Sequence, residues 1–172
     1  MSCILLGVFF LLACCKQSAP PAPDRQISEP QIIQTEQFDE EILRIAEDAQ
    51  RTLPIFFRHL TRPDPKEDRF CVKYPFKADD QSGIIMEQIW LTGIHFKDGE
   101  YYGVLSVTPL YLNSMKKGDT VAFNADAITD WMYVRNEKIV GGHSIKYLLE
   151  KIPENERSEE QRTMLEMFEE KY

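Results

Sequence analysis

The sequence predicts an α+β fold, in which a long N-terminal helix packs on a curved, mostly antiparallel sheet of about six strands and short helices follow. Three observations predict this class. An amphipathic run at helical spacing comes first, extended segments rich in β-branched and aromatic residues follow it, and turn signals separate those segments. The long helix can cover one face of the sheet, and closure of the sheet into a small barrel is one arrangement that would bury the other.

The first element is a helix that begins at Phe38 or Asp39 and runs to about Leu60. Pro54 removes one backbone donor from it, so we expect a kink there. The apolar residues that recur at helical spacing are Ile42, Ile45, Ala46, Ala49, Leu53, Phe56 and Leu60.

A first strand is expected over residues 70–76, where Pro75 indicates an edge position or a strand end. A hairpin over residues 89–96 and 101–107 follows, because Asp98 and Gly99 form a strong two-residue turn signal. This turn sets a register. It pairs Phe96 with Tyr101, Ile94 with Gly103 and Trp90 with Val107. One face of the hairpin would then carry Trp90, Ile94, Phe96, Tyr101, Leu105 and Val107.

Turn residues and β-branched residues alternate between Gly118 and Gly142, which indicates further short strands. On the strand after Asp130, we expect Trp131 and Tyr133 to face one way and Met132 and Val134 the other. A helix over residues 145–151 should follow, with Ser144 as its cap.

The last helix is predicted from a capping box, in which Ser158 precedes Gln161 by three residues. Its apolar stripe is expected to dock on the domain. That stripe comprises Met164, Leu165, Phe168 and Tyr172.

The N-terminal region has the pattern of an export signal and an anchor. Residues 4–13 are an unbroken apolar and small run, too short to span a bilayer. The run ends at Ala13 and Cys14, which resembles a bacterial lipobox, although no Lys or Arg precedes it. We expect three regions: a lipoprotein signal peptide (1–13), a lipidated Cys14 with a proline-rich tether (14–36), and one globular domain (37–172).

Cys14 would carry acyl chains, such as palmitate, that hold the protein on a membrane. Cys15 is not Asp, and by resemblance to bacterial sorting rules this favours the outer membrane, with the domain facing the periplasm. A formal net charge of −8 over 172 residues argues against nucleic acid as a partner.

Several short motifs follow one another in the chain, among them Glu87 with Trp90, and Asp130 with Trp131. Their order resembles the YegJ-like family, the bacterial domain of unknown function 2314. The resemblance covers about residues 70–149, and the preceding helix is also similar. Val107 departs from the family, which often has Asn near this position. The resemblance implies no activity, because the family has no assigned mechanism.

Four residues are candidates for binding a small ligand: Glu87, Trp90, Asp130 and Trp131. Each also has a structural interpretation. Asp130 can accept backbone N–H groups in a turn, Trp131 can belong to the core, and Glu87 can bind backbone or Lys73.

We predict no cofactor and no metal, because HxxxH, HxH and CxxC spacings are absent, and no serine-nucleophile motif is present. The leading hypothesis is therefore a lipid-anchored envelope protein that is not an enzyme and that binds an envelope partner or serves structurally. The alternative is a small-ligand binder or hydrolase that uses the four candidates. A periplasmic immunity or stress protein is a third hypothesis that the sequence does not separate from the first.

Overall fold

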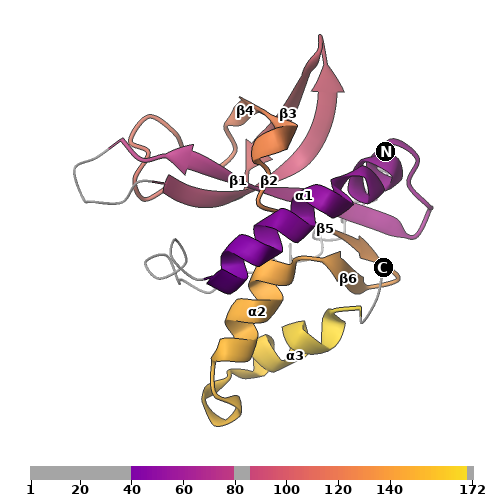
Figure 1. The fold of residues 1–172 in the computed structure, drawn as a ribbon, viewed down its shortest axis with the longest axis vertical. Coiled ribbons are helices and arrows are strands. Elements are labelled where there is room, and N and C mark those ends of the chain that lie inside the picture. Colours follow the sequence, from indigo (N-terminus) through magenta and orange to yellow (C-terminus); the bar gives the residue numbers. More distant parts are fainter. Residues whose placement is uncertain (1–39, 80–85, 170–172) are drawn as a thin grey trace, which may run out of the picture.

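The computed structural model describes residues 40–79 and 86–169 of the chain. The predicted leader, Cys14, the tether and a helix start at Phe38 or Asp39 lie outside these residues. The elements, in chain order, are α1 (Glu40–Thr61), β1 (Glu67–Lys77), β2 (Met86–Lys97), β3 (Glu100–Leu105), β4 (Thr120–Phe123), the 3-10 turn η2 (Ala125–Ala127), β5 (Asp130–Arg135), β6 (Lys138–Gly141), α2 (His143–Lys151), the 3-10 turn η3 (Glu154–Glu156) and α3 (Glu159–Met167) (Figure 1).

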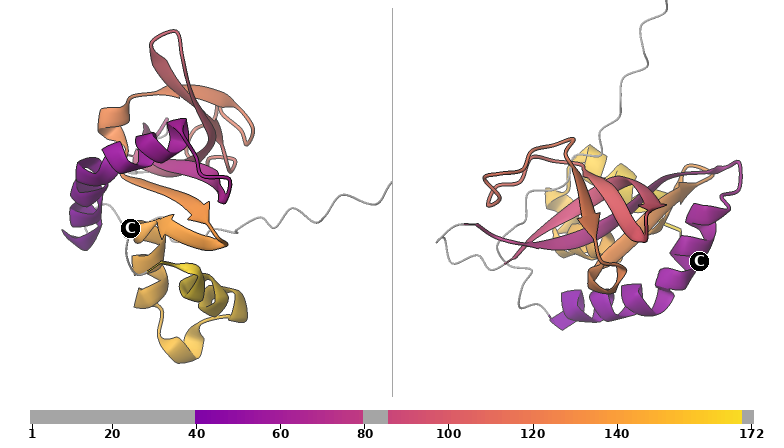
Figure 2. Two further views of the ribbon diagram at one scale, coloured as in Figure 1. Left: turned by 90° about the vertical axis from the view of Figure 1, so that its right-hand side faces the viewer. Right: turned by 90° about the horizontal axis from the view of Figure 1, so that it is seen from above.

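The strands form one six-stranded sheet in the order β4-β3-β2-β1-β5-β6, and every neighbouring pair is antiparallel. The predicted α+β class is therefore confirmed. The barrel is a wrong prediction, because the sheet is open with β4 and β6 at its edges. Helix α1 covers one face, while α2 and α3, rather than closure of the sheet, cover part of the other (Figures 1 and 2).

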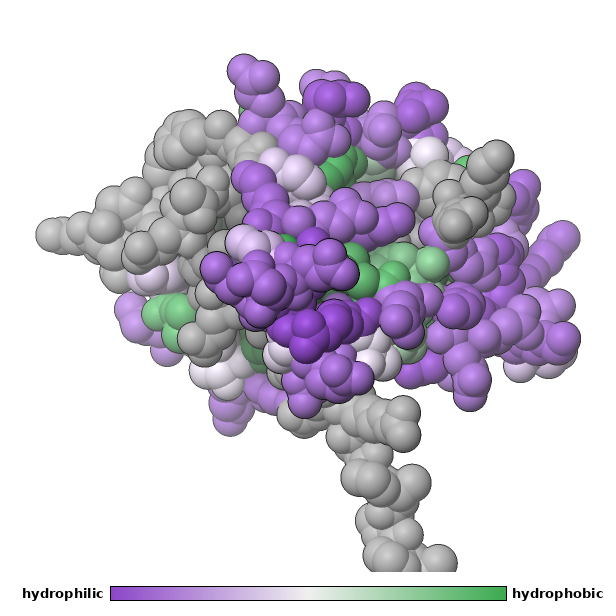
Figure 3. Space-filling view, turned by 90° about the horizontal axis from the view of Figure 1, so that it is seen from below, coloured by the Kyte–Doolittle hydropathy of each residue, from purple (hydrophilic) through white to green (hydrophobic). Residues whose placement is uncertain are grey.

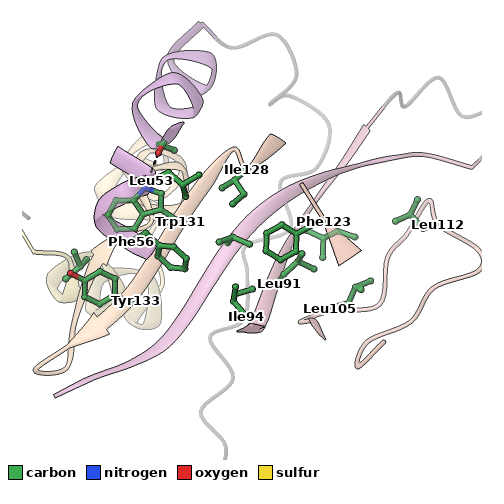
Figure 4. Packing of buried hydrophobic residues seen from close by; sticks show 14 residues of the cluster. Leu53, Phe56, Leu91, Ile94, Leu105, Leu112, Phe123, Ile128, Trp131 and Tyr133 are labelled. Carbon is green, nitrogen blue, oxygen red and sulfur yellow. Dashed lines mark hydrogen bonds between the residues drawn. The ribbon is translucent and has the colours of Figure 1, made fainter. Parts of the chain in front are cut away.

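Helix α1 packs its apolar stripe on the larger of two hydrophobic clusters. Leu53 and Phe56 from α1 meet Trp131 and Tyr133 from β5 (Figure 4). The acidic first turn and the basic last turn of α1 suit the helix dipole. Figure 2 shows α1 bent between two straighter segments, as expected for a helix with Pro54 in its interior.

The alternation predicted for β5 is confirmed. Trp131 and Tyr133 belong to the larger cluster with α1, whereas Val134 belongs to the smaller cluster on the other face, where Met132 packs against it. A turn at Asn136 and Glu137 joins β5 to β6, and its two residues have positive φ values of 50° and 64°. Both φ values suit the tight turn of a two-residue hairpin.

The predicted hairpin register holds only near the turn. Phe96 pairs with Tyr101, as expected, but the register shifts by one residue between Thr92 and His95. Gly93 lies inside the shift and has a φ of +58°. Glycine adopts this backbone conformation easily, so it suits a β-bulge. Beyond this bulge the two faces exchange. Ile94 and Leu105 share the larger cluster with Ile89 and Leu91, whereas Trp90 lies in the smaller one. The predicted pairing of Trp90 with Val107 is therefore wrong, because the Trp90 carbonyl accepts the backbone N–H of Ser106 instead. Ile94 and Gly103 lie inside the shift, between the pair Thr92–Val104 and the pair His95–Tyr102.

Strand β1 is an interior strand, and Pro75 lies near its C-terminal end, which agrees with the strand end that was one of the two positions predicted for it. Pro75 does pair with Gln88 of β2. The pairing of β1 with β5 ends at Lys73, so Pro75 lies where β1 is paired on one side only. A missing backbone donor is tolerated at such a position.

The capping box of Ser158 and Gln161 forms as predicted at the start of α3. Met164, Leu165 and Phe168 pack in the smaller cluster, which confirms the docking stripe as far as the structure describes it. Tyr172 lies outside the described residues. No helix in the described ranges is both long and apolar enough to cross a membrane. Hydrophilic side chains cover most of the face shown in Figure 3, and apolar ones show in small areas between them.

Candidate functional site

A row of three side chains crosses the sheet beneath the start of α2. Trp90 on β2 pairs with Lys73 on β1, and Lys73 pairs in turn with Asp130 on β5. Directly paired residues point to the same face of a sheet. All three are buried, and the lysine and the aspartate are only 7% and 1% exposed. A buried lysine and a buried carboxylate together are unusual enough to require an explanation.

Asp130 accepts hydrogen bonds at both of its carboxylate oxygens. Its Oδ1 accepts the backbone N–H of Trp131 at 2.8 Å, and its Oδ2 accepts both the N–H of Ser144 at 2.8 Å and the Ser144 hydroxyl at 2.7 Å. Gly142 is the N-cap of α2 and supplies no side-chain bond. The Asp130 carboxylate therefore caps this helix from a neighbouring strand, where the partial positive charge of the helix terminus favours an anion.

Ser144 stands between the carboxylate and the lysine. Its hydroxyl donates to Asp130 and accepts from Lys73 Nζ at 3.4 Å. The prediction that the Ser144 side chain caps α2 is wrong, because Ser144 lies in the first turn and its own amide is capped by Asp130. We name the three residues Lys73, Asp130 and Ser144 the capping cluster.

Burial raises the pKa of Asp130 above its ordinary value of 3.8, and this is the largest influence on it. The hydrogen bonds from Ser144 and then the charges of Lys73 and His143 act in the opposite direction. The helix start and the lysine thus offset part of the free-energy cost of removing the charged carboxylate from water.

Two glycines bring the start of α2 close to β5. Gly141 has a φ of +80°, and a Cβ at this position would overlap the carbonyl oxygen of Trp131. The N–H of Gly142 donates to that same oxygen at 2.9 Å. Only glycine fits so close an approach at positive φ, and the approach places the Ser144 amide over Asp130.

Glu87 and Trp131 lie on the opposite face, with α1. Glu87 accepts the backbone N–H groups of Leu110 at 2.8 Å and of Tyr111 at 2.9 Å. The Trp131 indole N–H lies 3.2 Å from both the Ala49 carbonyl oxygen and a side-chain hydroxyl of α1. The structure therefore brings Trp90 and Asp130 to one face and places Glu87 and Trp131 on the other.

The four candidates divide between the two faces because side chains alternate along a strand, and this alternation can be read from the sequence. Asp130 and Trp131 are neighbours in one strand, so they point to opposite faces. Residues 87 and 90 are three apart in one strand, which also separates them. Lys73 and Ser144 were not among the candidates for binding. The signal for Lys73 was a single charged residue within the otherwise apolar and aromatic residues 70–76.

A second buried polar network was not expected from the sequence. Glu67 is buried where β1 begins, and His59 Nδ1 from α1 lies 2.9 Å from its Oε1. Arg135 at the end of β5 lies 3.9 Å from Glu67 and 2.6 Å from Glu169. The network ties the end of α1 and the start of β1 to the end of β5 and to the segment after α3, which is a structural role.

The geometry of the capping cluster favours structure over catalysis. A lysine near a serine hydroxyl resembles a base beside a nucleophile. Here the hydroxyl already donates to a carboxylate, and Ser144 is only 2% exposed. Within residues 40–79 and 86–169, no three His, Cys, Asp or Glu side chains are grouped so that they could hold a metal ion.

Replacing Glu87 with glutamine should loosen the segment that it holds. One of the two acceptor oxygens is replaced by an amide NH₂ group that faces a backbone donor. A buried donor left without an acceptor typically lowers the free energy of unfolding by about 1–3 kcal/mol. We expect faster hydrogen exchange at the Leu110 and Tyr111 amides. Glu100→Gln is the control, because that exposed carboxylate accepts only the Tyr102 hydroxyl among the bonds found for it. Equal exchange in both variants would contradict the assigned role of Glu87.

The fold and the capping cluster define a small α+β domain whose sheet is held between α1 on one face and α2 and α3 on the other. The family described as "Uncharacterized protein conserved in bacteria (DUF2314)" matches residues 39–165. The chain belongs to this family, which confirms the resemblance, including that of the preceding helix α1, and extends it over most of α3.

Two curated relatives are similar to this chain. A putative ankyrin repeat protein of Neisseria meningitidis serogroup B is 38% identical over 133 residues, which cover 74% of this chain and 52% of the relative. The uncharacterized protein YegJ of Escherichia coli is 34% identical over 92 residues, or 54% of this chain and 58% of the relative. The chain thus spans about half the length of these relatives. No solved structure matches it.

Proposed function

We propose that this protein is a lipid-anchored component of the bacterial cell envelope whose α+β domain binds a partner or serves structurally and is not an enzyme. The observation that carries the anchor is the apolar run that ends at Ala13 and Cys14 in the pattern of a lipobox. A proline-rich segment follows, of the composition that serves as a spacer between an anchor and a domain.

The arrangement of the buried polar residues supports a binding or structural role. Asp130, Glu87 and Glu67 each accept hydrogen bonds from groups that they hold in place, including backbone N–H groups. Carboxylates used in this way define a rigid scaffold and are not directed at a substrate. The match to about half of a putative ankyrin repeat protein supports the view that the domain is a module that can be joined to other segments.

The alternative function is a small-ligand binder or hydrolase, and one observation favours it. The raised pKa of Asp130 and the 3.4 Å approach of Lys73 to Ser144 are features that active sites also have. The burial of all three groups argues against it, because a substrate would have to displace α2 to reach them.

Cys14→Ser tests the anchor. Cells that express the unsubstituted protein should incorporate labelled palmitate into it, and the Cys14→Ser variant should lose the label and leave the membrane fraction. Cys15→Ser is the matched control and should keep the label, because only the neighbouring cysteine changes. Label that persists in Cys14→Ser, or that is absent from the unsubstituted protein, would refute the anchor.

A further inference from the structure

The two edge strands of the sheet differ in whether another segment of the chain pairs with their outer side. At the β6 edge, the segment after α3 lies against the strand. Phe168 forms a parallel bridge with Ile139, and the Glu169 N–H donates to the Ile139 carbonyl at 2.9 Å. The ion pair between Arg135 and Glu169 holds this segment in place. The β6 edge is therefore covered by the chain's own C-terminal part, which is one way that proteins prevent edge-to-edge pairing.

The hydrogen bonds of β4 show which of its backbone groups point away from the sheet. At its start, Gly118 N–H donates to the Leu105 carbonyl and Leu105 N–H donates to the Asp119 carbonyl, both at 3.0 Å. Hydrogen-bonded pairs alternate along an antiparallel ladder. Given the register with β3, Val121 therefore bonds to β3, whereas Thr120 and its second neighbour Ala122 direct their N–H and C=O groups outward.

The outward edge of β4 lacks protection within the described part of the chain. No hydrogen bond between described residues reaches the outward backbone groups of Thr120 or Ala122, and both residues are exposed. The strand is Thr-Val-Ala-Phe, with no charge and no proline. Charged residues and prolines are the usual means by which an edge strand resists pairing, so β4 is open to an added strand.

We propose that a second copy of this chain pairs with β4 in antiparallel orientation, with Val121 of one copy opposite Val121 of the other. This register pairs Thr120 of each copy with Ala122 of the other, so every outward group of the two residues gains a partner. The sheets of both copies then form one continuous sheet across a two-fold axis.

Charge complementarity favours a second copy as the occupant. Lys116 and Lys117 are exposed just before β4, and Asp126 is exposed just after it. Antiparallel self-pairing brings the start of one strand beside the end of the other, so the lysines of each copy approach the aspartate of its neighbour. Because β4 is short, the association should be weak and dependent on concentration. It does not depend on the lipid anchor.

A cysteine at the two-fold axis tests this pairing. Residues opposite each other in a pair without hydrogen bonds have Cα atoms about 4.5 Å apart, within the range that a disulfide spans. Full-length Val121→Cys protein, treated with a mild oxidant, should form disulfide-linked dimers at about tenfold the level of Thr163→Cys. Thr163 is exposed on α3, and the unsubstituted protein sets the background of the native cysteines.

Ala122→Pro separates edge pairing from loss of the fold. The Ala122 N–H points outward, so proline removes an edge donor and leaves the ladder with β3 intact. In the Val121→Cys background, this change should return dimer formation to the Thr163→Cys level while the unfolding transition is retained. Dimers that persist in Ala122→Pro, a Val121→Cys yield no higher than that of Thr163→Cys, or a cross-link to a different protein would each overturn the proposal.

Discussion

Replacing Asp130 with alanine is expected to lower the free energy of unfolding by about 3–5 kcal/mol, because it breaks a buried charged network by removing one partner. The change leaves the Trp131 amide and both donors of Ser144 without their acceptor. It also removes the carboxylate that opposes the charge of buried Lys73. Urea unfolding followed by tryptophan fluorescence measures the loss, since both tryptophans are buried.

Asp48→Ala is the matched control for Asp130→Ala. Asp48 is an exposed carboxylate on α1 whose partner, Arg51, is exposed as well. Its removal should leave the unfolding transition unchanged within error. Asp130→Asn keeps one acceptor oxygen. It should unfold at a urea concentration between that of the unsubstituted protein and that of Asp130→Ala. If Asp130→Ala unfolds at the same urea concentration as the unsubstituted protein, the carboxylate does not hold α2.

The two single changes Asp130→Ala and Lys73→Met should also be non-additive. Once the carboxylate is gone, the lysine is a buried charge with less compensation, so replacing it by an apolar chain of similar length should restore part of the stability. A double variant whose loss equals the sum of the two single losses would show that the residues act independently.

Turn chemistry and alternation were sufficient to predict the elements and the faces of β5. Both failed where the chain departs from regular spacing. Gly93 lies in a bulge that adds one residue to β2, so Ile89, Trp90 and Leu91 lie on the faces opposite to those predicted relative to Ile94 and Leu105. A glycine inside a strand signals such a bulge, but it does not say whether one forms.

The capping cluster could be predicted only in part. Alternation places Lys73 opposite the face of the first strand that carries Phe70 and Val72. It does not reveal that α2 begins over Asp130, because that contact joins residues 14 apart through the β5–β6 hairpin. The network of Glu67, Arg135 and Glu169 was beyond sequence reasoning, because its members come from distant segments and match no local pattern.

Gly141→Ala should have the other large effect, a loss of about 3 kcal/mol or more in the free energy of unfolding. Two penalties combine at this position. The φ of +80° is unfavourable for any residue with a Cβ, and that Cβ would overlap the Trp131 carbonyl oxygen and lie 2.9 Å from two atoms of the indole ring. The carbonyl cannot easily move, because it also accepts the Gly142 N–H.

Gly99→Ala separates these two penalties. Gly99 has a φ of +91°, but a Cβ there would meet nothing within 4 Å. Its replacement should therefore show the backbone strain alone, about 1–2 kcal/mol. The excess loss in Gly141→Ala measures the steric overlap, which should also displace the start of α2 and alter the fluorescence of Trp131. Equal losses in the two variants would mean that β5 relaxes around the added methyl group, and that the close approach of Gly141 is not what sets the helix over Asp130.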